Sequence, residues 1–187
     1  LAASPPTRRP AGRDNLFFAL QPESAARVAI QSVADRLAER QLLRRRPVPA
    51  DCWHVTLLYI GRFDGIPSEV IEAACAVANR VDVAPFRLCL ERLMSFDGRP
   101  GEHPLVLCPT AVPTPLQHLQ AALAVHARRL GLVRRSGSFT PHLTLGREAV
   151  HLLPENVDPI CWDVRAFVLV HSLIGQGRHI VLRRWPA

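Results

Sequence analysis

Two copies of a histidine–x–threonine–leucine motif hold the residues of this sequence whose types and spacing could do chemistry. One copy lies in each half of the chain: His54-Val55-Thr56-Leu57 and His142-Leu143-Thr144-Leu145. Side chains two positions apart on a β-strand point to the same face, so each histidine would project together with its threonine. If the two strands face each other, two imidazoles and two hydroxyls share one cleft. Such a set can move protons at neutral pH and hold an anion without a metal ion.

Apolar segments around both motifs predict the strands that would position these side chains. We expect strands over 53–60 and 143–146, with alternate apolar residues packed behind the motifs: Val55, Leu57, Leu143 and Leu145. A basic loop precedes each strand, with these arginines: Arg44, Arg45, Arg46, Arg134 and Arg135. The repeated order of basic loop and motif strand indicates a duplicated, two-lobed α+β domain. The alternative is that both histidines are ordinary sheet residues whose imidazoles bond nearby backbone.

Periodic apolar patterns predict three helices and several further strands. The helices are expected over 23–40, 67–79 and 115–130. The first helix would bury Ala26, Ile30, Val33, Ala34 and Leu37, and the third Leu116, Leu119, Leu123 and Leu130. The further strands are expected over 16–20, 86–90, 105–108, 164–171 and 179–185. The last two would form a hairpin around Gly175-Gln176-Gly177.

The charge of the chain favours polyanionic partners, because the net charge is +7 and the isoelectric point is about 10.4. All 23 basic residues are arginine. The absence of lysine excludes a lysyl-adenylate intermediate, a Schiff base and a P-loop lysine. A general compositional bias also accounts for the arginines, since Ala, Leu, Val and Pro are abundant as well.

The cysteines and the other histidines give no separate site. Five dispersed cysteines without a C-x-x-C pair are typical of buried free thiols in a reducing compartment: Cys52, Cys75, Cys89, Cys108 and Cys161. Cys52 lies two residues before His54, but we expect it to pack rather than to act as a nucleophile. No chemistry is assigned to the remaining histidines, and no zinc pattern includes them: His103, His118, His126, His151, His171 and His179.

Four segments together resemble a known family. They are the strand 15–20, the first motif with its lead-in over 50–57 and Gly61, the second motif over 139–145 with Arg147, and the final hairpin over 177–185. The chain resembles the 2H phosphoesterases over 15–185, and within them the bacterial RNA 2′,3′-cyclic phosphodiesterases, once called 2′-5′ RNA ligases. Trp53 departs from the pattern, where a smaller aliphatic residue is usual. The family's usual lysines are also absent, although arginine can replace them at phosphate contacts.

The resemblance implies a bilobal α+β fold, with two pseudo-symmetric lobes of antiparallel sheet and outer helices around a central cleft. Residues 14–187 would form this single domain, and residues 1–13 a flexible tail. By the resemblance, His54 is the proton donor and His142 the proton acceptor. Thr56, Thr144 and Arg147 would bind the phosphate. The family needs no metal ion or other cofactor.

The function implied by the resemblance is hydrolysis of RNA 2′,3′-cyclic phosphate ends to 2′-phosphomonoesters, with the reverse 2′-5′ ligation in vitro. The partners would be RNAs with such ends, transfer-RNA fragments among them, and no membrane. We expect a cytoplasmic monomer, because residues 1–13 lack an apolar signal core and the apolar run 167–174 is too short to span a bilayer. One alternative is a non-catalytic module that binds RNA ends. Another keeps the fold but acts on a linear 2′-5′ oligonucleotide or a small cyclic nucleotide.

Overall fold

One antiparallel sheet runs through the computed structural model, which describes residues 13–43, 46–134, 137–148 and 150–187. Within these residues the strands are β1 (Asp14–Leu20), β2 (Arg46–Pro47), β3 (Val55–Phe63), β4 (Phe86–Ser95), β5 (His103–Cys108), β6 (Leu143–Glu148), β7 (Glu155–Val164), β8 (Ala166–Leu173) and β9 (Arg178–Pro186). Their order across the sheet is β7-β4-β5-β6-β3-β1-β8-β9, with β2 beside β6. Residues 1–12 of the predicted tail 1–13, and Arg44, Arg45 and Arg135, lie outside the described residues.

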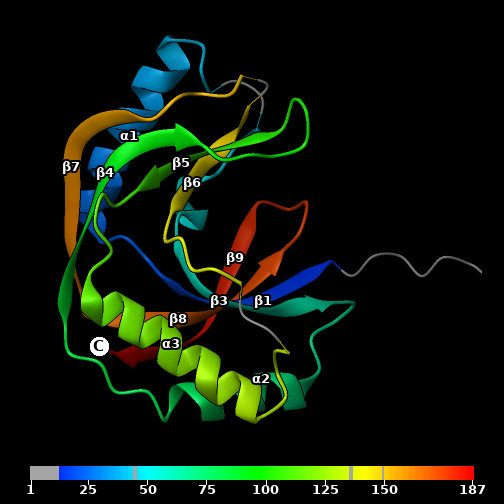
Figure 1. The fold of residues 1–187 in the computed structure, drawn as a ribbon. Coiled ribbons are helices and arrows are strands. Elements are labelled where there is room, and N and C mark those ends of the chain that lie inside the picture. The colour runs from blue at the N-terminus through cyan, green and yellow to red at the C-terminus, as the bar shows by residue number, and fades with distance from the viewer. Residues whose placement is uncertain (1–12, 44–45, 135–136, 149) are drawn as a thin grey trace, which may run out of the picture.

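The sheet is divided into two lobes, which meet between β6 and β3 (Figure 1). Helix α1 (Ser24–Glu39) packs on the lobe of β7, β4, β5 and β6, where it contacts β7. Helices α2 (Ser68–Ala78) and α3 (Thr114–Arg129) contact each other, and α3 covers β3 of the other lobe. The predicted bilobal α+β fold, with antiparallel sheet inside and helices outside, is confirmed. No helix of the described residues is long and apolar enough to cross a membrane.

The lobes do not correspond to the two halves of the sequence. The lobe that carries the first motif on β3 also contains β8 and β9 from the end of the chain. The other lobe combines α1 with β7, a strand that the sequence patterns did not predict. The prediction that Leu130 packs inward was wrong, because α3 ends at Arg129 and Leu130 is 42% exposed.

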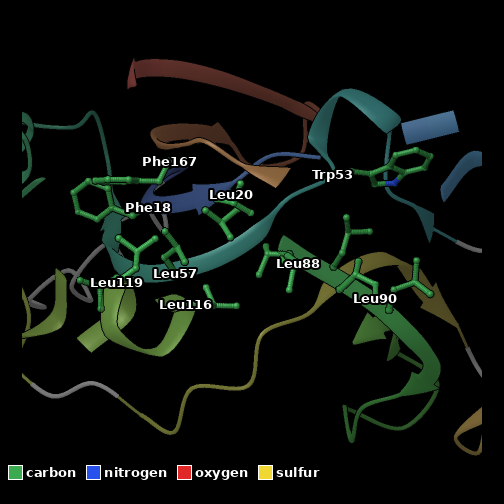
Figure 2. Packing of buried hydrophobic residues seen from close by; sticks show 14 of the residues in the cluster. Phe18, Leu20, Trp53, Leu57, Leu88, Leu90, Leu116, Leu119 and Phe167 are labelled. Carbon is green, nitrogen blue, oxygen red and sulfur yellow. The ribbon is translucent and has the colours of Figure 1, made fainter. Parts of the chain in front are cut away.

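The larger of two clusters of buried hydrophobic residues extends through both lobes, and Figure 2 shows part of it. The buried face of α1 consists of the predicted residues Ala26, Ile30, Val33, Ala34 and Leu37. Trp53, the departure from the family pattern, is only 3% exposed and belongs to the same buried cluster as Leu88 and Leu90 of β4. Its indole is therefore part of the core that the two lobes share.

The prediction of five free thiols was wrong for Cys89 and Cys161, which form a disulfide. The two residues are directly opposite one another on β4 and β7, although 72 positions separate them in the sequence. Pairing of these strands is what brings the sulfur atoms together, and β7 itself was not predicted. The free cysteines among the described residues are Cys52, Cys75 and Cys108. Because Cys89 and Cys161 are paired, they do not support the expectation of free thiols in a reducing compartment.

Gly146 allows β2 to cross closely beside β6. A Cβ added there would lie 2.8 Å from the carbonyl oxygen of Arg46 and 2.5 Å from a methyl carbon of Leu43. Because a backbone atom must move, we expect Gly146→Ala to lower the free energy of unfolding by about 1–3 kcal/mol. Urea denaturation measures this change, with Gly137→Ala as the control, since a Cβ at Gly137 meets no atom within 4 Å. Equal urea midpoints for the two variants would contradict this close packing.

Candidate active site

The two motif strands meet at one antiparallel pair, Val55 and Leu143. Both residues are fully buried, so the neighbours on either side of each one project from the opposite face of the sheet. In an antiparallel pair, the residues that flank the paired position also lie opposite one another. The register therefore places two histidine–threonine couples across the lobe junction: Thr56 with His142, and His54 with Thr144. The predicted gathering of the four motif side chains is what the structure shows.

The same β-bulge follows the threonine in both motifs. In β3 the extra residue is Leu57, because Phe18 pairs with Leu58 and Ala19 with Thr56. In β6 the extra residue is Leu145, because Leu105 pairs with Gly146 and Val106 with Thr144. A bulge shifts the alternation of side chains by one residue. The third residue after each threonine therefore returns to the face of the motif.

Those third residues are Arg147 in the second motif and Tyr59 in the first. Arg147 is exposed, and it pairs with Arg46 on the neighbouring strand β2. Arg46 forms an ion pair with Glu102 at 3.2 Å. The structure thus brings the predicted Arg147 to the side of Thr144. Tyr59 is 49% exposed and donates its hydroxyl to Asn15 Oδ1 at 3.0 Å. Sequence reasoning missed Tyr59, because only the bulge gives it a place equivalent to that of Arg147.

Each motif histidine donates Nδ1–H to the backbone carbonyl two residues before it. The Nδ1···O distances are 2.7 Å from His54 to Cys52 and 2.8 Å from His142 to Thr140. A carbonyl oxygen only accepts, so the hydrogen of each neutral ring is on Nδ1. The Nε2 atoms remain for chemistry, and that of His54 lies 3.1 Å from Thr56 Oγ1. The imidazoles do bond nearby backbone, as the alternative supposed, but each uses only one nitrogen for it.

Aromatic rings hold the two histidines differently. The His54 ring stacks on Phe17 of β1 at a centroid distance of 4.8 Å and makes a T-shaped contact with His179 of β9 at 5.0 Å. Within the described residues, His142 has one such neighbour, Phe96, at 4.8 Å. Sequence reasoning missed all three aromatic partners. They come from segments far from the motifs, so no local pattern marks them.

Burial changes the titration of the first-motif histidine. Burial is the main cause that lowers the pKa of His54, and the nearby His142 lowers it further. The hydrogen bond to the Cys52 carbonyl favours the protonated ring and opposes these effects. Burial, together with the charge of His54, lowers the pKa of His179 to about 4. His179 is therefore a neutral imidazole at physiological pH.

Cys52 has a packing role, as predicted. The residue is 4% exposed, and its thiol donates to the Gly177 carbonyl at 3.2 Å. Burial raises the pKa of Cys52, which keeps the thiol protonated and a poor nucleophile. Cys52 belongs to the 3₁₀-helix η1 (Ala50–Cys52), so this contact attaches the lead-in of the first motif to the hairpin of β8 and β9.

A cavity of about 330 Å³ adjoins the motif residues. Both motifs contribute to its wall, together with α3 and the segment before β6: Thr56, Leu57, Leu58, Tyr59, Gln120, Gly137, Ser138, Phe139, Thr140 and His142. Its volume is within the range of small-ligand sites. In the described part of the chain, no group of three or more His, Cys, Asp or Glu side chains is arranged to hold a metal ion.

Comparison with known proteins gives the family of this chain. The family model described as the 2′-5′ RNA ligase superfamily matches residues 21–173. No curated protein matches the chain significantly.

Several solved structures share the fold over nearly the whole chain. The structure of E. coli LigT in apo form is 26% identical, with a TM-score of 0.75, and the match covers 92% of this chain and 96% of that one. E. coli LigT complexed with 3′-AMP is 28% identical, with a TM-score of 0.77 and coverage of 92% and 97%. TT0787 of Thermus thermophilus is 25% identical, with a TM-score of 0.74 and coverage of 92% and 97%. The paired motifs, the bilobal sheet and the family match agree, and the chain belongs to the 2′-5′ RNA ligase superfamily of 2H phosphoesterases.

Proposed function

We propose that this protein hydrolyses 2′,3′-cyclic phosphate ends of RNA to 2′-phosphomonoesters, with His54 and His142 as an acid–base pair. One observation carries the proposal. The Val55–Leu143 bridge gathers both motifs at the lobe junction, and within the described residues the Nε2 atom of each histidine has no backbone partner. A proton acceptor and a proton donor on two sides of one anion are what cleavage of a cyclic phosphate diester requires.

The reaction has four changes of bonding. Nε2 of His142 accepts a proton from water, and the water oxygen forms a bond to phosphorus. The bond between phosphorus and the 3′ oxygen breaks, and Nε2–H of His54 gives its proton to that oxygen. The products are a 2′-phosphomonoester and a 3′-hydroxyl. Thr56, Thr144 and Arg147 donate hydrogen bonds to the non-bridging oxygens, where negative charge increases in the transition state.

The environments of the two histidines support these roles. His54 is enclosed by Phe17 and His179, and its lowered pKa makes the protonated ring a stronger acid. The negative charge of a bound phosphate favours that protonated ring. His142 has fewer aromatic neighbours and lines the cavity, where a water molecule can reach it. Ligation of 2′-5′ ends in vitro would use the same groups, with a 5′-hydroxyl in place of water as the nucleophile.

The cavity supports a nucleotide as part of the substrate. Tyr59 and Phe139 contribute aromatic rings to its wall, and aromatic rings stack with nucleobases of any sequence. The matching structure of E. coli LigT was complexed with 3′-AMP. We propose RNA ends in the cytoplasm as the substrates, transfer-RNA fragments among them, and a monomeric enzyme.

Two alternative functions for the same site predict different results. A non-catalytic RNA-end binder would hold a cyclic phosphate end without converting it. A phosphodiesterase for linear 2′-5′ linkages would cleave such oligonucleotides faster than it opens cyclic ends. We expect conversion of the cyclic end to dominate, because each motif brings a histidine and a threonine to the lobe junction. Incubation with three matched oligonucleotides, cyclic-ended, linear 2′-5′ and linear 3′-5′, measures these rates side by side.

Turnover should not require a metal ion. The mechanism assigns proton transfer to His54 and His142 and charge stabilisation to Arg147 and the threonines, so no step calls for a divalent cation. We expect the metal-stripped protein to open a cyclic-ended oligonucleotide equally fast with and without EDTA. The rate is followed by separation of substrate and product ends. Loss of activity in EDTA that a divalent ion restores would contradict this mechanism.

The pH profile of kcat/KM should be bell-shaped, because one imidazole must be neutral and the other protonated. The acidic limb reports the addition of a second proton to the pair. Burial and the charge of His142 both oppose that proton on His54, so the acidic limb should lie below pH 6.5, the ordinary pKa of histidine. Initial rates at constant ionic strength, with folding checked by circular dichroism at each pH, measure the profile. An acidic limb above pH 6.5 would contradict this electrostatic account.

A further inference from the structure

The two catalytic histidines have pseudo-symmetric backbones but different surroundings. Both have the same Nδ1 hydrogen bond, the same following threonine and the same bulge. Among the described residues, His54 alone of the two lies against a second imidazole, that of His179. His179 is on β9, 125 residues after His54, and sequence reasoning gave it no part in chemistry. Its ring is the feature that makes the two sides of the site unequal.

Phe17, His54 and His179 form a cluster in which every ring contacts the other two. Phe17 stacks on His54 at 4.8 Å, and His179 makes T-shaped contacts with His54 at 5.0 Å and with Phe17 at 5.6 Å. The register explains this arrangement. Asn15 of β1 pairs with Ser172 of β8, which pairs with His179 of β9, so His179 lies on the same face of the sheet as Asn15 and Phe17.

The hairpin that carries His179 also supports the hydrogen bond of His54. The Cys52 thiol donates to the carbonyl of Gly177, in the turn just before β9, and the carbonyl of the same Cys52 accepts Nδ1–H of His54. The hairpin therefore reaches His54 in two ways, through the ring of His179 and through η1. Among the described residues, the titratable groups that face His54 are His142 of the other lobe, Cys52 of η1 and His179 of β9.

We propose that His179 is a positioning residue, whose ring holds His54 against Phe17 and keeps water from the His54 ring. The neutral imidazole adds bulk without adding charge, because the pKa of His179 is lowered to about 4. His54 is then fixed with Nε2 toward the lobe junction and partly desolvated, while His142 stays accessible to water. The catalytic readouts below rest on the proposed function, but the titration of His54 does not.

His179→Ala and His179→Phe separate positioning from imidazole chemistry. In His179→Ala, water reaches the His54 ring, and that ring gains freedom to move. We expect the pKa of His54 to rise toward 6.5, the acidic limb of kcat/KM to rise with it, and kcat to fall roughly 10-fold with little change in KM. In His179→Phe, an uncharged ring still covers His54. We expect this variant to retain the lowered pKa of His54 and to recover most of the lost kcat.

The His54 pKa is measured by NMR titration of its imidazole carbon and proton signals, in full-length folded protein, with kcat and KM measured on the same samples. His118→Ala, on the exposed side of α3, is the histidine control and should leave the titration of His54 unchanged. An unchanged His54 pKa in folded His179→Ala would overturn the proposal. So would equal defects in the Ala and Phe variants, because the imidazole itself would then be required. If the wild type converts no cyclic phosphate, the proposed function fails, and the titration still decides whether His179 positions His54.

Discussion

His54→Ala and His142→Ala should each lower the single-turnover rate on a cyclic-ended oligonucleotide roughly 10²–10⁴-fold, the usual effect of removing a positioned general acid or base. Folding should be largely preserved, because both side chains lie at the lobe junction and neither belongs to the hydrophobic cluster. The double variant should lose little more than either single variant, since the two groups act in one step. Single-turnover rates and thermal unfolding, measured on the same samples, check these expectations.

Asparagine at either position is the matched control. Its side-chain amide can donate to the Cys52 or Thr140 carbonyl as Nδ1–H does, but it has no group that corresponds to a titrating Nε2. His54→Asn and His142→Asn should therefore fold well and still lose the rate. If either variant stays folded and retains a near-wild-type rate, that histidine is a sheet residue that only bonds backbone.

The second large effect should come from the threonine hydroxyls. Thr56→Val and Thr144→Val retain the branched shape that favours a strand but remove one donor to the non-bridging oxygens. Loss of one such donor commonly costs roughly 10²–10³-fold in kcat. We expect about 10²-fold for each, because Arg147 still stabilises the same charge, and therefore a smaller loss than in the histidine variants. kcat and KM for the cyclic-ended oligonucleotide measure the effect.

Serine is the control for these variants, since it restores the hydroxyl and removes only a methyl group. Thr56→Ser and Thr144→Ser should recover most of the rate lost on substitution by valine. The register places Thr56 opposite His142 and Thr144 opposite His54, and Thr56 Oγ1 also lies 3.1 Å from His54 Nε2, so Thr56→Val changes the surroundings of both histidines. Valine variants that match the wild type would show that the threonines are strand residues without a role in charge stabilisation.

The sequence was sufficient to predict the motif strands and the face that their side chains share. The alternation of His54 and Thr56 with buried Val55 is a local pattern, and period-2 alternation needs only the pleat of a strand. Arg147 was predicted from the family resemblance. Strict alternation would put Arg147 on the opposite face from Thr144. The bulge at Leu145 returns Arg147 to the face of Thr144, and this bulge arises from pairing with β5, which the local sequence does not reveal.

What the sequence did not predict depends on contacts between distant segments. β7 contains Asp158, Pro159 and Asp163, so its pattern is not that of a buried strand, and it lies at the edge of the sheet. Without β7, the pairing of Cys89 with Cys161 could not be inferred. His179 and Phe17 meet His54 only because β9 and β1 both pair with β8. The local sequence around β7, the two cysteines and His179 contains no pattern that predicts these contacts.

The identity of the product end tests the paired-histidine account most directly. An oligoribonucleotide with a 2′,3′-cyclic phosphate end is incubated with the wild-type protein, and the phosphate of the product is assigned by ³¹P NMR. With His142 activating water and His54 protonating the 3′ oxygen, the product should be the 2′-phosphomonoester with a free 3′-hydroxyl. A product with a 3′-phosphate, or a cyclic end left intact by folded protein, would contradict the account.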